Sequence, residues 1–173
     1  MAKRFWYLSP DCEMTLAEGL DEYTSAYSFL NNNDGKTEAS AWFRKHDLTH
    51  VIFGTLPFEI RGETINDLWT IFGSDVTLKG YMQFFSATQI SYNTIIESYI
   101  PRYGNKFSVY WEMVRQIPIS CVTVVRAFKM TRKWPWHHPE AYLTRSLKDI
   151  RVEFGIRLID TAQIGRASCR ERV

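Results

Sequence analysis

Hydrophobic side chains recur at every third or fourth position along much of the chain, which is the spacing of amphipathic helices. The first such stretch begins with a Thr15-x-x-Glu18 capping box. A turn-forming segment, Asn31 to Lys36, separates it from a second predicted helix, Thr37 to Phe53, which ends before Gly54. The pattern therefore predicts two helices joined by one loop.

The middle of the chain repeats this pattern, with glycine and proline between shorter apolar stretches. A loop is expected over residues 55–61, and three helices follow it. Their predicted ranges are Glu63 to Phe72, then a helix capped by Ser74-Asp75 and running to Phe85, then Ile90 to Tyr99, closed by Pro101.

The segment 105–130 has two interpretations. Its apolar residues from Phe107 to Val114 have helical spacing, and Pro118 then interrupts the pattern. The β-branched stretch from Ile119 to Val125 fits a buried strand as well as a helix.

The last predicted helix starts at Pro139, because proline suits the first position of a helix. It places Leu143, Leu147 and Ile150 on one face. Together these stretches predict an all-α domain of six or seven helices with at most one strand. Strands do not alternate with helices, which disfavours an α/β nucleotide-binding fold.

Residues 164–173 resemble the translation of a high-throughput sequencing adapter, and we expect them to be unstructured. The single domain is then expected over residues 1–163. The whole chain has a formal net charge of +2. Without the three arginines and one glutamate of the last segment, it has 18 basic and 18 acidic residues. A neutral domain offers no electrostatic argument for nucleic-acid binding.

The composition, 45% hydrophobic and 15% aromatic, is typical of a folded protein. No apolar run approaches the roughly 18–20 residues that span a bilayer, since the longest, Ile117 to Met130, contains Pro118 and Arg126. No signal-peptide core follows the basic N-terminal residues. Outside residues 164–173 the cysteines are Cys12 and Cys121, without a CxxC pair, and we expect reduced thiols. We therefore expect a cytoplasmic protein, soluble or peripherally bound to the inner face of a membrane.

His46, Asp47 and His50 form a His-Asp-x-x-His pattern on the second predicted helix. At this spacing the two imidazoles lie roughly 40° apart around the helix axis and about 6 Å apart along it, so both reach one ion. Asp47 can close on the same ion or orient a ligand. Glu63, which begins the next predicted helix, can supply a further oxygen. Imidazole and carboxylate ligands suit Zn²⁺, Fe²⁺ or Mn²⁺ better than Ca²⁺.

The same spacing also occurs in helices without a metal, where an Asp–His hydrogen bond belongs to a partly exposed polar stripe. Here the pattern lies among Trp42, Phe43, Ile52 and Phe53. Burying such polar groups without partners costs on the order of several kcal/mol, and a metal ion removes that cost. The apolar surroundings therefore favour the metal interpretation.

The string His46-Asp-Leu-Thr-His50, followed by Gly62-Glu63, resembles the signature of the coenzyme Q biosynthesis protein 4 family. In that signature His-Asp-x-x-His is followed by an intervening stretch and Glu. The intervening stretch is one residue longer here than in the family pattern.

The resemblance spans roughly Ala39 to Ile156 and includes the segments Asp67 to Asp75 and Leu147 to Ile156. Because of the longer stretch before Glu63, Glu59 and Asp67 remain alternatives for the fourth ligand.

The resemblance implies an all-α domain with a divalent metal, zinc first and iron or manganese as alternatives, bound by His46, Asp47, His50 and Glu63. It implies a role in ubiquinone biosynthesis through this metal. That role is oxidative removal of the ring-C1 carboxylate from a prenylated aromatic precursor, organisation of other quinone-biosynthesis proteins at a membrane, or both.

Two other functions remain open. One is a non-catalytic isoprenoid-lipid-binding scaffold with a structural metal. The other is a His-Asp-type metal phosphohydrolase, a class that expects a further upstream histidine, whereas no histidine precedes His46. A homodimer is also left open.

A long isoprenoid tail needs a groove lined by aromatic and aliphatic side chains. The candidates follow the metal-binding helix, and ordinary core packing is the alternative for each of them: Trp69, Phe72, Tyr81, Phe84 and Phe85.

A basic stretch leads into a tryptophan pair near residue 134, which fits an anionic membrane interface or a solvated helix end. His137 and His138 are assigned to the adjoining turn rather than to a metal. The residues of this stretch are Arg126, Lys129, Arg132, Lys133, Trp134 and Trp136.

Overall fold

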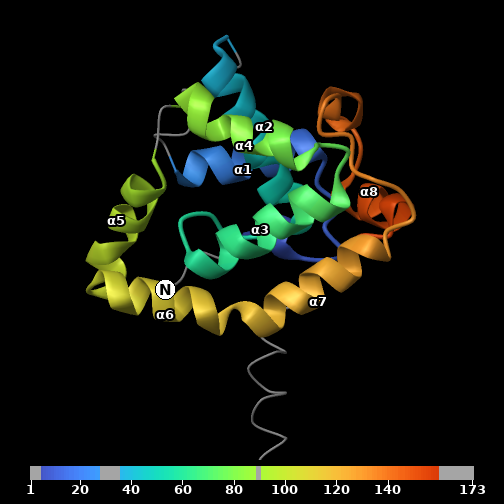
Figure 1. Ribbon diagram of the computed structural model, residues 1–173. Helices are drawn as coiled ribbons and strands as arrows, with labels where there is room; N and C mark the ends of the chain where they lie inside the picture. Colours follow the sequence, from blue (N-terminus) through green and yellow to red (C-terminus); the bar gives the residue numbers. More distant parts are fainter. Residues whose placement is uncertain (1–4, 28–35, 89–90, 160–173) are drawn as a thin grey trace, which may run out of the picture.

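Helices make up the fold. The computed structural model describes residues 5–27, 36–88 and 91–159, the side chains of 84–88 excepted. In these ranges the chain forms eight α-helices and no strand, which confirms the predicted all-α class. The helices are α1 (Leu16–Ala26), α2 (Glu38–Phe53), α3 (Ile60–Gly73), α4 (Leu78–Thr88), α5 (Tyr92–Tyr103), α6 (Lys106–Arg115), α7 (Ile117–Phe128) and α8 (Leu147–Phe154), with 3-10 helices η1 (Trp6–Leu8) and η3 (Pro139–Tyr142) (Figure 1).

The second half of α2 lies in the core. Its residues from Asp47 to Phe53 are all buried, and apolar side chains of α1, α3 and α8 belong to the same core cluster. A capping box on Thr37 starts α2, and Gly54 ends it with a left-handed φ of 63°. Both ends agree with the prediction, so the histidines lie where the sequence placed them along the helix.

Three predicted boundaries near the centre of the chain are wrong. α4 begins at Leu78, where the Thr77 hydroxyl accepts from the Gly80 amide, and not after the predicted cap Ser74-Asp75. α3 begins at Ile60, three residues before its predicted start, because the Glu63 amide already donates to the Glu59 carbonyl oxygen. Pro101 lies inside α5 rather than closing it. Near the C-terminal end of a helix, proline removes one backbone hydrogen bond, and α5 continues for two residues beyond it.

The ambiguous stretch from Ile119 to Val125 is helical, which gives one helix more than the largest number predicted. Ile119, Thr123 and Ala127 recur every four residues on α7 and are buried, and α7 packs along α3. This burial against a helix decides between the two interpretations.

The predicted final helix is divided. Pro139 starts η3, and α8 begins only at Leu147, where the Ser146 side chain caps it. The predicted segment 164–173 and most of the predicted loop at Asn31 to Lys36 lie outside the described residues.

Arg151 on α8 joins three segments of the core. Its guanidinium donates to the carbonyl oxygens of Ile52 and Val51 at 2.9 and 2.8 Å, and to those of Ser9 and Tyr7, each at 2.7 Å. Burial lowers the pKa of Arg151 to about 10, so the group stays charged at neutral pH. A cation at the carbonyl end of α2 is favourable because it meets the negative end of the helix dipole.

α5, α6 and α7 follow one another along the outside of the molecule. In Figure 1 α5 lies at the left, and α6 and α7 run below α3. α7 packs on α3, while α5 and α6 form a smaller cluster with Ile60 at the start of α3. In the described ranges no helix combines the length and the apolar character that a membrane crossing requires.

Candidate metal centre

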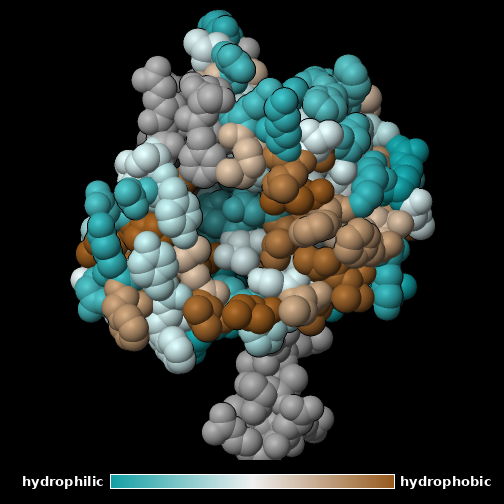
Figure 2. Space-filling view, viewed as in Figure 1, coloured by the Kyte–Doolittle hydropathy of each residue, from teal (hydrophilic) through white to brown (hydrophobic). Residues whose placement is uncertain are grey.

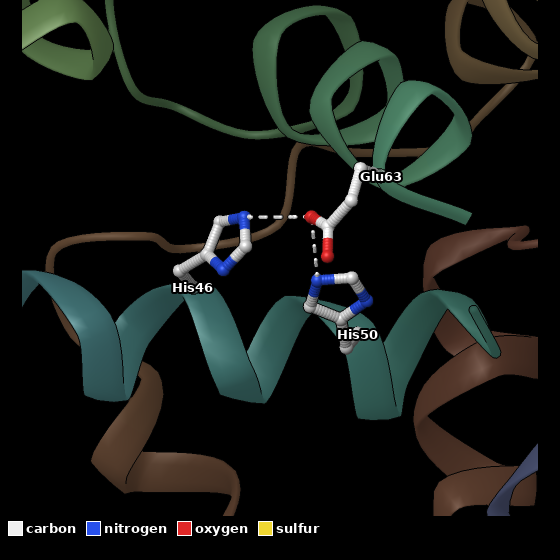
Figure 3. A group of neighbouring side chains, drawn as sticks. All are labelled: His46, His50 and Glu63. Carbon is white, nitrogen blue, oxygen red and sulfur yellow. Dashed lines mark ion pairs between the residues drawn. The ribbon is translucent and has the colours of Figure 1, made fainter. Parts of the chain in front are cut away.

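The candidate site lies between α2 and α3. His46 and His50 point from α2 towards Glu63, which reaches over from the first turn of α3 (Figure 3). Glu63 Oε2 lies 3.2 Å from His50 Nε2 and 3.8 Å from His46 Nε2. One ligand atom from each residue lies within 4.8 Å of the other two. Three of the four predicted ligands therefore converge on one point.

A close backbone contact puts Glu63 in this position. A Cβ atom on Gly62 would lie 1.8 Å from the Leu56 carbonyl oxygen, so the loop after α2 packs directly on the start of α3. Phe58 has a φ of 60°, and its amide donates to Glu63 Oε1 at 2.7 Å. One carboxylate oxygen is thus held by the loop, and the other faces the histidines.

His50 is fully buried and presents one nitrogen to the site. Its Nδ1 lies 2.8 Å from Thr55 Oγ1. With the proton on Nδ1, the Nε2 lone pair faces the Glu63 carboxylate, and Nε2 has no hydrogen-bond partner within the described part of the chain. Two electron-rich groups at this distance repel each other unless a cation or a proton lies between them.

His46 occupies a mixed polar and aromatic position. The Asn66 amide nitrogen lies 3.3 Å from its Nε2 and donates to Thr49 Oγ1 at 3.1 Å. The Trp42 ring stacks on the imidazole, with centroids 5.0 Å apart. Asp67 Oδ1 lies 3.7 Å from His46 Nε2 and accepts a 2.6 Å hydrogen bond from Tyr81.

The electrostatics of the site suit a cation. Burial raises the pKa of Glu63, but its interactions with the His50 and His46 imidazoles and with the Phe58 amide outweigh burial and hold the pKa at about 2. Burial lowers the pKa of His46, yet its contact with Asp67 and the charge of Glu63 raise the pKa overall. A metal ion entering here replaces a proton, because the imidazole must be neutral to bind it.

Asp47 lies outside the group of three. Its Oδ1 accepts a 3.1 Å hydrogen bond from the Tyr23 hydroxyl, and the Tyr23 ring stacks on His50 with centroids 5.7 Å apart. This geometry makes Asp47 a residue that positions His50 through Tyr23. Of the two alternatives for the fourth ligand, Glu59 pairs with Arg102 at 2.6 Å, whereas Asp67 borders the site.

The residues that were predicted to line a lipid groove lie in different surroundings. Trp69 is fully buried and stacks on Phe53 in the core, and half-buried Phe72 contacts Phe128. Tyr81 is buried beside the site. The side chains of Phe84 and Phe85 lie outside the described residues.

The basic and the aromatic residues of the predicted membrane-facing stretch also differ in exposure. Its basic side chains are mostly exposed, but Trp134 and Trp136 are buried, with 1% and 4% of their surface exposed. The Trp134 amide donates to the carbonyl oxygen of Gly73, the last residue of α3, and the Trp136 amide donates to Oδ1 of Asp75 just after it. These tryptophans are packed against the protein and do not face a membrane. His137 and His138 are exposed in the turn, as expected.

Sequence reasoning missed the supporting residues Thr55, Asn66 and Tyr23. Asn66 follows Glu63 by three positions, a spacing that puts both on one helix face, so a signal for it was present. Thr55 and Tyr23 reach the site through a loop and another helix, and no local pattern marks them.

The donor set fits a divalent ion: two imidazole nitrogens and one carboxylate oxygen converge, and the buried His50 nitrogen has no other partner. Asp67 can add an oxygen from the solvent side. No protein-family model, curated protein or solved structure matches the chain.

Proposed function

We propose that the protein uses a divalent metal ion in ubiquinone-type biosynthesis, for oxidative removal of the C1 carboxylate from a prenylated aromatic precursor. One observation carries this proposal: ligand atoms of His46, His50 and Glu63 lie within 4.8 Å of one another. These residues belong to the pattern that resembles the coenzyme Q biosynthesis protein 4 signature.

The degree of exposure favours a catalytic rather than a structural metal. The His50 side chain is fully buried, but those of Glu63 and Asp67 are 22% and 46% exposed. The centre is therefore open on its α3 side. Structural zinc sites are usually closed by four protein ligands, whereas catalytic sites keep a position for water or substrate.

In the proposed reaction the bond between ring C1 and the carboxylate breaks and carbon dioxide leaves. Two electrons pass to an external oxidant, dioxygen or a quinone, and a hydroxyl group from water replaces the carboxylate with release of one proton. When bound, the metal ion would orient the acid and stabilise negative charge as the carbon–carbon bond breaks.

The residues of the chain keep the ligands in place. Thr55 fixes the ring orientation of His50 through Nδ1, the nitrogen that faces away from Glu63. Asn66 lies 3.3 Å from Nε2 of His46, the nitrogen that faces Glu63. Trp42 covers His46, and Tyr81 and Trp136 pack against Trp42 with ring centroids 5.3 and 5.8 Å away. This aromatic cluster holds the Trp42 ring against the His46 imidazole.

The first test is elemental analysis of the purified protein. We expect about one equivalent of a divalent transition metal in the unmutated chain, and loss of most of it in His46→Ala and His50→Ala. His138→Ala is the matched control, because His138 is exposed in a turn away from the three ligands. An unmutated protein that takes up no metal, even after incubation with zinc, iron or manganese, would contradict the proposal.

The second test separates catalysis from scaffolding. Glu63→Gln keeps an oxygen that accepts the Phe58 amide hydrogen bond, so the loop is retained while the charge at the site is lost. We expect quinone formation to stop although the protein remains abundant. Glu59→Gln is the control, since Glu59 pairs with Arg102. Quinone formation at the normal rate in Glu63→Gln would favour the scaffold instead.

A further inference from the structure

An apolar stripe runs along the outer sides of α6 and α7. Phe107, Trp111 and Phe128 are 78%, 57% and 66% exposed, and Val114 and Val125 are 50% and 51% exposed. In Figure 2 hydrophobic side chains line the lower edge of the molecule, where Figure 1 draws these helices. Monomeric soluble proteins rarely gather large exposed apolar side chains on one face unless that face binds a partner or a membrane.

The stripe has the regularity of a binding face. Its positions recur at alternating intervals of four and three residues, the spacing of a helix face that contacts a partner, and the series passes from one helix to the next. These positions are Phe107, Trp111, Val114, Pro118, Cys121, Val125 and Phe128.

Core packing does not explain the stripe. The side of α7 that packs in the core carries Ile119, Thr123 and Ala127, all buried. The exposed stripe is thus a second apolar face on a helix whose first face is already used.

The α7 end of the stripe is basic. The segment from Asn105 to Lys133 contains six basic residues and one acidic residue, Glu112. Three of the six, Lys106, Arg115 and Arg132, pair with Glu97, Glu112 and Glu153. Arg126 and Lys133 donate to backbone carbonyl oxygens, which leaves their charges uncompensated. Lys129 is exposed beside Phe128 at the end of α7.

A half-open groove of about 560 Å³ extends the same face between α7 and residues 155–158. Val122 and Val125 contribute apolar surface to it, while Arg126, Lys129 and Arg157 contribute three cationic side chains. An apolar groove edged by cations matches a lipid with an acidic headgroup.

We propose that the α6–α7 face docks on an anionic membrane surface, with both helices parallel to the bilayer plane and the stripe in the headgroup region. Aromatic and aliphatic side chains favour this region, and basic residues add attraction to acidic lipids. A second copy of the chain fits less well, because pairing two such faces would bring the uncompensated basic side chains of α7 together.

Docking here does not require the metal site. α7 packs on α3, and α3 carries Glu63, so the docking face and the candidate metal site lie on neighbouring helices.

Co-sedimentation with vesicles tests the docking face. We expect the full chain to bind vesicles that contain phosphatidylglycerol, to bind pure phosphatidylcholine vesicles more weakly, and to lose affinity as salt is raised. The triple variant Phe107→Ser, Trp111→Ser, Phe128→Ser should bind at least about tenfold more weakly. Lys129→Glu should weaken binding to the acidic vesicles selectively.

Matched control variants are on α4, which lies in the upper part of the molecule in Figure 1, away from α6 and α7 at the bottom. Leu78 is 59% exposed and Lys79 is exposed, so Leu78→Ser and Lys79→Glu make the same chemical changes away from the stripe. Both should bind like the unmutated chain. All variants retain residues 160–173, so any contribution of that segment cancels.

A second measurement does not depend on the folding of the triple variant. Trp111 fluorescence, obtained as the difference between the chain and Trp111→Phe, should shift to shorter wavelength when acidic vesicles are added. No vesicle binding by the unmutated chain, or equal binding by the stripe and α4 variants, would overturn the proposal. Concentration-dependent dimerisation that the triple variant abolishes, without vesicle binding, would instead assign the face to a second copy.

Discussion

At the scale of single residues, Thr55 decides which nitrogen of His50 faces the site. Its hydroxyl lies 2.8 Å from Nδ1, and the ring cannot turn because it is fully buried against Tyr23. Such partners behind a metal-binding histidine fix both the tautomer and the ring orientation.

Thr55→Val keeps the shape of the side chain and removes this partner. We expect the affinity for zinc to fall by about 10- to 100-fold, measured by competition with a chromogenic chelator. Thr24→Val is the control, since the Thr24 hydroxyl bonds to carbonyl oxygens of its own helix. Equal affinities of the two variants would show that Thr55 has no role in orienting the ligand.

Asp47 offers a second test at this scale, because the sequence suggested a ligand and the structure shows a contact with Tyr23. Asp47→Asn keeps an oxygen that accepts the Tyr23 hydrogen bond. We expect it to retain close to a full equivalent of metal in elemental analysis, unlike His46→Ala. Metal loss as complete as that of His46→Ala would show that Asp47 is itself a metal ligand.

At the scale of elements, the crossing of the Thr55 to Glu59 loop with α3 brings the two halves of the site together. Gly62 makes this crossing close, since any side chain there would collide with the Leu56 carbonyl group. Backbone cannot move aside as easily as a flexible side chain, so the position admits glycine alone.

Gly62→Ala should therefore lower the free energy of unfolding by about 1–3 kcal/mol and weaken metal binding by displacing Glu63. Urea unfolding and zinc titration measure the two effects. Gly80→Ala on α4 is the control: its Cβ atom would lie 3.1 Å from Thr77 Oγ1, and helix propensity favours alanine by up to about 1 kcal/mol. If the Gly62 variant were as stable as the Gly80 variant, the inferred collision would be wrong.

At the scale of the whole molecule, Arg151 connects the N-terminal segment, the end of α2 and α8. Its hydrogen bonds satisfy four carbonyl oxygens whose residues are far from it in sequence. Arg151→Met removes these donors and leaves buried carbonyl groups without them, so we expect a loss of about 1–3 kcal/mol in the free energy of unfolding.

Denaturant unfolding of Arg151→Met measures this loss. Arg145→Met is the matched control, because Arg145 is 39% exposed and pairs with Glu153 at the surface. It should cost less than about 1 kcal/mol. A similar small cost for Arg151→Met would mean that its hydrogen bonds do not hold the three segments together.

Much of the helical organisation followed from the sequence alone. The capping box at Thr15, the cap at Gly54 and the spacing of His46 and His50 are local features, and short-range backbone geometry determines them. The same locality allowed the sequence to place both histidines on one face of a helix.

Tertiary structure decided what local patterns left open. Burial against α3 made the Ile119 to Val125 stretch helical, and the contact between Gly62 and Leu56 brought Glu63 over the histidines. Distant partners likewise turned Asp47 towards Tyr23 and buried the Trp134 side chain. In each case the deciding energy is packing between segments far apart in sequence, which no periodicity or spacing along the chain records.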